Sequence, residues 1–250
     1  MLKIDAKGVY YKTLNQHIRE LIAEGEKEFE LINVNGQRYI GDGIKGEDIK
    51  IVVNGVPGND LGAFMDGPTI IVNSNAQDAV GNTMGNGKII IKGHAGDVIG
   101  YGMRGGKIFI KEDVGYRVGI HMKGYLDQNP LLICGGTAGD FFGEYMAGGT
   151  LILLGLNNNE NKNTKRPIVG SYLATGMHGG VIYIRGEIDE KNIGEEAGIK
   201  ELDSDDEKVL EGYLKEYCQD LNIDINKVTN KRFIKLLPVS SRPYGNLYDY

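Results

Sequence analysis

Residues 61–110 read LGAFMDGPTIIVNSNAQDAVGNTMGNGKIIIKGHAGDVIGYGMRGGKIFI and contain one unit three times. Each unit has an apolar residue, a glycine, two variable residues and a methionine, and a short apolar run follows the methionine. The methionines Met65, Met84 and Met103 are spaced 19 residues apart. Self-similarity at a fixed short period is the signature of a repeat architecture, so the repeat decides which folds need to be considered.

The unit continues along the chain and keeps aligned columns. The methionine column is Met65, Met84, Met103, Met122, Met146 and Met177, with the last two intervals lengthened to 24 and 31 residues. Three residues earlier the column is Gly62, Gly81, Gly100, Gly119 and Gly143, followed by Ala174. Four residues earlier it is Leu61, Val80, Ile99, Val118, Phe142 and Leu173. Columns of constant character indicate that equivalent residues lie above one another, about 4.8 Å apart.

A parallel β-helix is the architecture that fits this period. Helical repeats would need longer runs with 3.6-residue spacing, and a four-stranded propeller blade needs a longer unit. We therefore expect an all-β, single-stranded β-helix of six to seven coils, with methionine as an adaptable core filler and glycine at corners with positive φ. Val80 should point into the core. Lys88 lies outside the apolar columns, so Lys88→Asp should change stability little.

Two different flanks surround the repeat and are expected to cap its ends, giving three segments: residues 1–43, 44–186 and 187–250. In the first, Thr13 to Gln16 suggests the capping box of a helix that ends at Gly25, and Phe29 to Tyr39 suggests a hairpin around Asn35-Gly36. The third is acidic and partly helical, with Asp205-Asp206 ahead of an amphipathic stretch. Asn157 to Lys165 should form an exposed loop, and Phe233 to Tyr250 should pack on the rod or on a partner.

Composition narrows the functional classes. The net charge of −6 argues against a nucleic-acid-binding protein. The acidic residues are unevenly distributed: the segment from Glu187 to Asp220 contains 13 Asp and Glu residues and only four lysines. No apolar run reaches the ~20 residues of a membrane span, and the first residues show no signal-peptide core, so we expect a cytoplasmic protein without membrane association. Two cysteines, Cys134 and Cys218, cannot form a disulfide scaffold.

Candidate chemistry in the repeat is sparse. Six residues before the methionines stand Asp78, Asp97 and Asp140, which could hold a cation but are expected rather to accept backbone N–H groups of their own loops. The two G-x-G-x-x-G matches, starting at Gly41 and Gly100, are expected to be coil corners and not nucleotide sites. Cys134 is expected in the core, and the four histidines are scattered. We therefore predict no catalytic, cofactor or metal residue in this chain.

Four stretches of the repeat together resemble the C-terminal GXGXG domain of the glutamate synthase large subunit, over about residues 38–186. These are Asn54 to Phe64 (NGVPGNDLGAF), Asn75 to Lys92 (NAQDAVGNTMGNGKIIIK), Glu144 to Gly155 (EYMAGGTLILLG) and Gly176 to Ile184 (GMHGGVIYI). One coil of that family is matched only loosely, by Val114 to Gly124. The 31-residue last interval and the acidic tail also depart from the family pattern.

The resemblance implies a right-handed parallel β-helix without catalytic residues. In the family, a glutaminase domain and a domain holding FMN and an iron–sulfur cluster carry the reaction, and the β-helix helps to hold them in register. The chain resembles that domain as a separate subunit. We therefore expect a role in glutamate biosynthesis, with a glutaminase subunit and an FMN-binding subunit as partners. FMN and the iron–sulfur cluster are expected in those partners. The chain could also associate with further copies of itself.

Two other assignments remain open from the sequence. One subunit of formylmethanofuran dehydrogenase and one subunit of the enzyme that makes N-methylglutamate are built from similar coils, and both would again make the chain a structural subunit. A different class is a stand-alone polysaccharide-active β-helix, which would be expected to carry a secretion signal and an aromatic or acidic groove.

Overall fold

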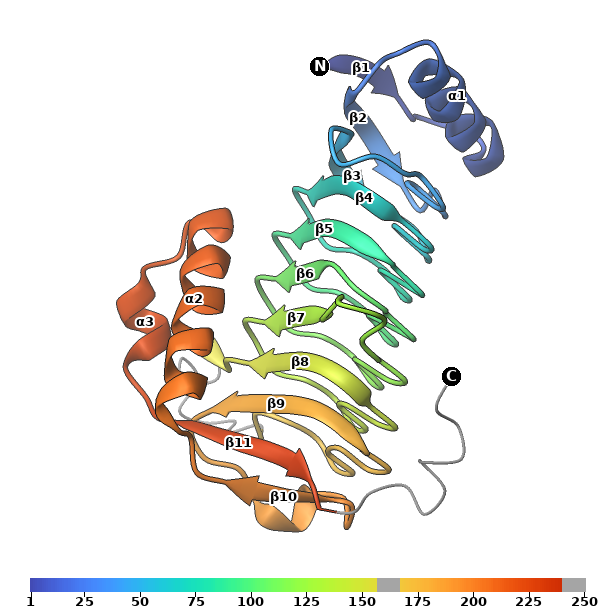
Figure 1. Ribbon diagram of the computed structural model, residues 1–250. Coiled ribbons are helices and arrows are strands. Elements are labelled where there is room, and N and C mark those ends of the chain that lie inside the picture. Colours follow the sequence, from blue (N-terminus) through green and yellow to red (C-terminus); the bar gives the residue numbers. More distant parts are fainter. Residues whose placement is uncertain (157–166, 240–250) are drawn as a thin grey trace.

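One continuous sheet organises the computed structural model, which describes residues 1–156 and 167–239. Within these ranges eleven strands lie in the order β1-β2-β3-β4-β5-β6-β7-β8-β9-β11-β10. Each strand from β1 to β8 pairs in parallel with the next one in the chain. Parallel pairing of successive strands requires the chain to wind back to the same edge every time, and Figure 1 shows the resulting stack. The predicted parallel β-helix is confirmed.

The stack consists of β1 (Leu2–Asp5), β2 (Glu28–Asn35), β3 (Lys50–Val56), β4 (Asp66–Val72), β5 (Asn86–Ile91), β6 (Lys107–Ile110), β7 (Leu131–Cys134), β8 (Ala147–Leu153) and β9 (Gly179–Arg185). Strands β4 to β9 coincide with the apolar runs that follow the methionines, whereas β1 to β3 precede Met65. The register is constant: Ile70 pairs with Ile89, and Ile89 with Ile108. Because side chains alternate along a strand, this register keeps one row of apolar side chains inside the rod through every coil.

A glycine corner closes each coil, and Gly81 shows why the residue is required. Its φ is +68°, and a Cβ at this position would lie 2.3 Å from Cδ1 of Ile108. Its N–H donates to the carbonyl of Leu61 in the preceding coil at 2.8 Å. Positive φ and close approach of an isoleucine from the next coil both exclude a side chain here.

The N-terminal flank adds the parallel strands β1 and β2, joined by a helix, rather than a hairpin. Helix α1 (Tyr11–Ala23) buries Leu14 and Ile18 against the core, and Glu24 is its C-cap. The predicted capping box at Thr13 is wrong, because the helix starts two residues earlier and Tyr10 makes no side-chain cap. The predicted hairpin is also wrong: residues 28–35 form the single strand β2, which pairs in parallel on both sides. Hydrogen bonds to the next coil follow directly after β2: the N–H of Gly36 donates to the carbonyl of Val56, and the carbonyl of Ile40 accepts from Gly62.

The C-terminal flank returns to the rod and covers its last coil. A short 3₁₀ helix (Glu190–Asn192) and β10 (Ala197–Lys200) precede α2 (Ser204–Leu221), α3 (Ile225–Thr229) and β11 (Phe233–Pro238). Strand β11 pairs antiparallel with both β9 and β10 and so protects the edge of the final coil. The segment from Phe233 to Pro238 therefore packs on the rod itself. Helix α2 lies beside the strands of the later coils in Figure 1.

Some sequence-based expectations lie outside the described residues. They concern the polar stretch Asn157 to Lys165 and the segment after Val239, which includes Arg242-Pro243-Tyr244. In residues 1–156 and 167–239, no helix combines the length and the apolar character needed to cross a membrane.

Candidate functional site

The methionine and glycine columns lie at one corner of the rod. All six methionines of the column are fully buried: Met65, Met84, Met103, Met122, Met146 and Met177. The Met84 carbonyl accepts the N–H of Arg104 from the next coil at 2.8 Å, so the columns are stacked by backbone hydrogen bonds. The glycine column has φ between +66° and +74° at Gly62, Gly81, Gly100, Gly119 and Gly143, and Ala174 adopts +59° in the same position.

Two further columns at this corner are left-handed but are not filled mainly by glycine. Five residues before the methionines, φ is positive at Asp60, Ala79, Val98, Arg117, Phe141 and Tyr172. One residue before them, it is positive at Phe64, Thr83, His121 and Tyr145. A left-handed conformation costs an L-residue roughly 1–2 kcal/mol, so these side chains are kept at an energetic cost. Several are aromatic and exposed, including Phe64, Tyr145 and Tyr172.

A cavity of about 460 Å³ opens at this corner between neighbouring coils. His121 stacks on Tyr145, with ring centroids 5.4 Å apart and planes inclined by 10°, and meets the edge of Tyr101 at 5.8 Å. Arg104 and Lys123 also line the cavity. The full lining is Thr83, Tyr101, Gly102, Arg104, His121, Lys123, Tyr145, Ala147 and His178. It contains cationic, imidazole and phenol groups and no carboxylate.

A second aromatic stack continues the same corner on the outside of the later coils. Phe141 and Tyr172 stack at 4.8 Å, and the guanidinium of Arg117 lies 4.8 Å from the Phe141 ring centroid. Arg117 is also paired with the buried Glu144 at 2.8 Å. Its charge is therefore neutralised within the rod, whereas Arg104 and Lys123 have no carboxylate within salt-bridge distance among the described residues.

The aspartate column forms a hydrogen-bond ladder rather than a cation site. Oδ1 of Asp78 accepts the backbone N–H of Asp97, and Oδ1 of Asp97 accepts that of Tyr116. Asp140 does the same for Ser171. The sequence-based expectation of backbone capping therefore has the right chemistry, but the capped N–H belongs to the next coil and not to the residue's own loop. Across the described ranges, no group of three or more His, Cys, Asp or Glu is arranged to hold a metal ion.

The cysteines lie in the two cores of the molecule. Cys134 ends β7, has no exposed surface, and is paired in register with Ile110 and Leu153. Burial raises the pKa of its thiol far above the ordinary value, and burial also raises the pKa of Cys218 in α2. A thiol held protonated is a poor nucleophile, so neither cysteine has the environment of a reactive one.

Acidic residues of α2 pair with lysines on the outer face of the sheet. Glu216 lies 2.7 Å from the ammonium groups of both Lys88 and Lys107, and Asp220 lies 2.8 Å from Lys88. Lys88 also lies 5.5 Å from the ring centroid of Phe109. Lys88 thus joins the repeat to a helix about 130 positions later that the repeat pattern does not reveal. With these contacts, Lys88→Asp is expected to lower stability instead of leaving it nearly unchanged.

A second apolar core lies beneath α2. Leu210, Leu214 and Tyr217 pack on side chains from the outer face of β5 to β9, and the Tyr217 hydroxyl donates to the carbonyl of Ile110 at 3.0 Å. The Tyr183 hydroxyl donates to Asp206 at 2.6 Å. Burial would raise the pKa of Asp206, but hydrogen bonds from Lys235 and Tyr183 outweigh it and lower the pKa. The acidic segment is thus a docked part of the fold.

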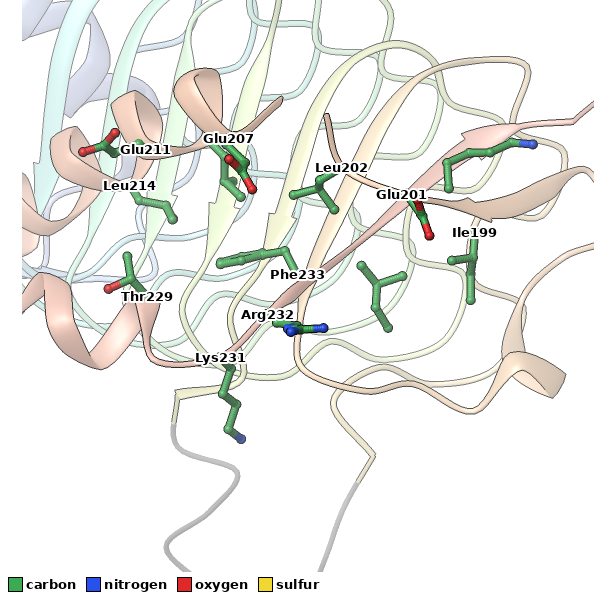
Figure 2. A pocket seen from close by; sticks show the side chains of 13 residues that line it. Ile199, Glu201, Leu202, Glu207, Glu211, Leu214, Thr229, Lys231, Arg232 and Phe233 are labelled. Atoms are coloured by element: carbon green, nitrogen blue, oxygen red, sulfur yellow. The ribbon is translucent and has the colours of Figure 1, made fainter. Parts of the chain in front are cut away.

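Another cavity, about 790 Å³, lies between this helix and the terminal strands. Figure 2 shows Leu202 and Phe233 near its middle, with the charged side chains of Glu207, Glu211 and Arg232 around them. Its lining joins apolar residues to both signs of charge: Ile199, Lys200, Glu201, Leu202, Glu207, Leu210, Glu211, Leu214, Thr229, Lys231, Arg232, Phe233 and Ile234. Because apolar, acidic and basic side chains are mixed, the lining does not favour any one class of ligand.

Both G-x-G-x-x-G matches are corners of the rod, as expected. Gly41 and Gly100 take positive φ, and the segments that follow lead into β3 and β6 and not into a helix. The phosphate-binding arrangement needs a helix N-terminus directly after the glycines, which these coils do not provide.

Comparison with known proteins agrees with this geometry. The GXGXG motif family matches residues 13–239. The chain belongs to the GXGXG family. A protein of Methanocaldococcus jannaschii, described as uncharacterized, is 50% identical over 250 residues, which cover 98% of this chain and 95% of that protein. The GXGXG match reaches into both flanks, beyond the residues on which the resemblance to the glutamate synthase domain rests.

The aromatic and basic groups at the corner were missed by sequence reasoning. Several of the aromatic residues stand one or five residues before the methionines, and Arg104 and Lys123 stand directly after them; these columns vary too much to attract attention as a motif. The column directly before the methionines holds glycine in some coils, namely Gly43, Gly102 and Gly176. The signal that could have revealed the corner is that large side chains recur in this column in the other coils.

Proposed function

We propose that this GXGXG protein is a non-catalytic structural subunit of a glutamate synthase-type complex. It would dock a glutaminase subunit and an FMN-binding synthase subunit and hold them at a fixed separation. FMN and the iron–sulfur cluster would be bound by those partners. The observation that carries the proposal is the GXGXG match over residues 13–239 on a continuous stacked rod.

The architecture suits a spacer. Every coil is hydrogen-bonded to its neighbours, α1 packs at one end, and β11 covers the edge of the last coil at the other. A solenoid closed in this way resists bending and further stacking, because each unit is fixed by the units beside it. Two enzymes bound to such a rod would keep their active sites in register, which favours direct transfer of ammonia from one to the other.

Reconstitution tests the proposal. The chain is purified and mixed with a glutaminase subunit and an FMN-binding synthase subunit from the same organism. Glutamate formation from glutamine and 2-oxoglutarate, and release of ammonia into the buffer, are then measured with and without the chain. We expect the chain to bind both subunits and to raise the fraction of ammonia converted to glutamate. Flavin binding or glutaminase activity in the chain alone would contradict the proposal, and so would failure to bind either subunit.

A further inference from the structure

The corner cavity has the composition of a recognition surface for carboxylates. Arg104 and Lys123 supply positive charge, and the imidazole rings of His121 and His178 line the same cavity. Since the lining contains no carboxylate, these groups lack a counter-charge within the cavity. On a chain of net charge −6, a local positive cavity steers a negatively charged partner to one place.

The backbone at this corner does not require the aromatic side chains. Tyr145 and His121 adopt φ of +51° and +55°, values that other coils satisfy with glycine in the same column, such as Gly102. Stacking of the two rings contributes roughly 0.5–1.5 kcal/mol, which does not exceed the cost of two left-handed residues at roughly 1–2 kcal/mol each. The rings therefore bring little net stability, and their exposed faces are available for contact.

The extent of the surface favours a protein over a small anion. Tyr101 and Tyr145 remain 41% and 46% exposed, and the exposed aromatic residues extend beyond the cavity to Phe64, Tyr116 and Tyr172. A small-molecule site usually encloses most of its ligand, whereas protein interfaces are enriched in tyrosine, phenylalanine and arginine. We propose that this corner surface docks a carboxylate-bearing segment of a protein partner.

The proposal rests on the proposed function only for the identity of that partner, which would be the glutaminase or the FMN-binding subunit. Carboxylates of the segment would pair with Arg104 and Lys123, and its apolar or planar groups would pack on Tyr101 and Tyr145. Arg117 is excluded from this role because Glu144 already neutralises it.

The first experiment uses the full chain and needs no partner subunit. A hexaglutamate peptide is titrated into the protein at low salt, and tyrosine and histidine side-chain NMR signals are followed. We expect shifts at Tyr101, His121, Tyr145 and His178 that disappear in the double variant Arg104→Glu/Lys123→Glu. Hexalysine should produce none. Absence of these shifts, or shifts of equal size with free glutamate, would overturn the proposal.

The second experiment measures binding of the two subunits to the same double variant. A matched control carries Lys92→Glu and Lys111→Glu, which make the same charge change on exposed residues after β5 and β6, at the other ends of these strands. We expect the corner variant to weaken binding of one subunit by about tenfold or more, and the control to leave it within about twofold.

The outcomes separate the two proposals. If hexaglutamate binds at the corner but wild-type chain binds neither subunit, the surface stands and the proposed function fails. If a subunit binds the corner variant as tightly as wild type, the proposed function stands and the corner proposal is overturned. Self-association that is lost in the corner variant, measured by sedimentation, would assign the surface to a second copy and would also overturn it.

Discussion

Oδ1 of Asp78 accepts the backbone N–H of Asp97, 19 residues later, at 2.9 Å. The same bond recurs from Asp97 to Tyr116 at 2.8 Å and from Asp140 to Ser171 at 2.8 Å. Each carboxylate thus satisfies a donor that the sheet ladder leaves unpaired at a bend, and it joins two coils. The residue beneath the carboxylate must be small: a Cβ on Gly96 would lie 2.0 Å from Oδ1 of Asp78.

This arrangement predicts a measurable coupling between Asp78 and Gly96. Asp78→Ala should lower the free energy of unfolding by about 1 kcal/mol, because the Asp97 N–H loses its acceptor. Gly96→Ala should cost more, since the new methyl group collides with the carboxylate. The double variant should cost less than the sum of the two, because the collision disappears when Asp78 is shortened. Denaturant unfolding of the four proteins checks this, and strict additivity would contradict it.

Val80 tests the interior column. Its side chain is fully buried, so Val80→Asp would place an unpaired charge in the core and should cost roughly 3 kcal/mol or more. Lys92→Asp is the proper comparison, because Lys92 is exposed and makes no ion pair among the described residues, and it should change stability by less than about 0.5 kcal/mol. Thermal unfolding of both variants provides the measurement. Similar losses would argue against the assignment of the inner face.

The contact of α2 with the rod should depend on pH. Burial would raise the pKa of Glu216, but hydrogen bonds from Lys107 and Lys88 outweigh it and lower the pKa below its ordinary value. A carboxylate with a lowered folded-state pKa stabilises the fold fully above its unfolded pKa, about 4.3, and loses this contribution as the pH falls through the lower folded value. Wild type should therefore lose stability on acidification below about pH 4.3 by more than Glu216→Gln does.

Unfolding measured at a series of pH values checks this prediction. Glu211→Gln is a suitable control, since Glu211 is exposed and, among the described residues, forms an ion pair only with Lys215 along the same helix. An identical acid response of wild type and Glu216→Gln would mean that the ion pairs with Lys88 and Lys107 contribute nothing to the stability of the docked helix.

The repeat could be predicted because its cause is local. Leu61, Gly62 and Met65 each meet the same environment as their equivalents 19 residues later, so the column pattern records packing directly. The position of α2 could not be predicted, because the partners of Lys88 are Glu216 and Asp220, far along the chain and on another element. Amphipathicity indicated that this helix has a buried face but not which surface covers it.

The errors at the N-terminal flank have a similar origin. Asn35-Gly36 has the local chemistry of a tight hairpin, but β2 lies between two parallel neighbours, and Gly36 (φ +80°) turns the chain into the first coil instead. Pairing of β2 with its two parallel neighbours therefore outweighs the preference of Asn35-Gly36 for a hairpin turn. Aromatic residues at the corner such as His121 and Tyr145 were missed because what distinguishes them is a left-handed backbone, which the sequence shows only once the coil geometry is known.

Cys134 and Cys218 should be unreactive in the folded protein. Burial raises the pKa of both thiols, and Cys134 has no exposed surface. Labelling with a thiol reagent at neutral pH should therefore be slow in buffer and should reach two equivalents only in denaturant. The labelling rate of Cys134 should follow the population of the unfolded chain. Fast labelling of native Cys134→Ser protein would identify Cys218 as accessible and contradict the burial of its side chain in the core under α2.

Phe64 combines a left-handed backbone with an exposed aromatic side chain, so its variants test whether the backbone conformation requires that side chain. It adopts φ +54° with 58% of its surface exposed, in a column that holds Gly43 and Gly102 in other coils. Phe64→Gly should therefore be more stable than Phe64→Ala by about 1 kcal/mol, because alanine keeps the left-handed strain and glycine removes it. Thermal unfolding of the two variants gives the difference. If alanine were as stable as glycine, the corner would relax from the left-handed conformation in solution, and the argument that its aromatic side chains are retained for contact would lose its basis.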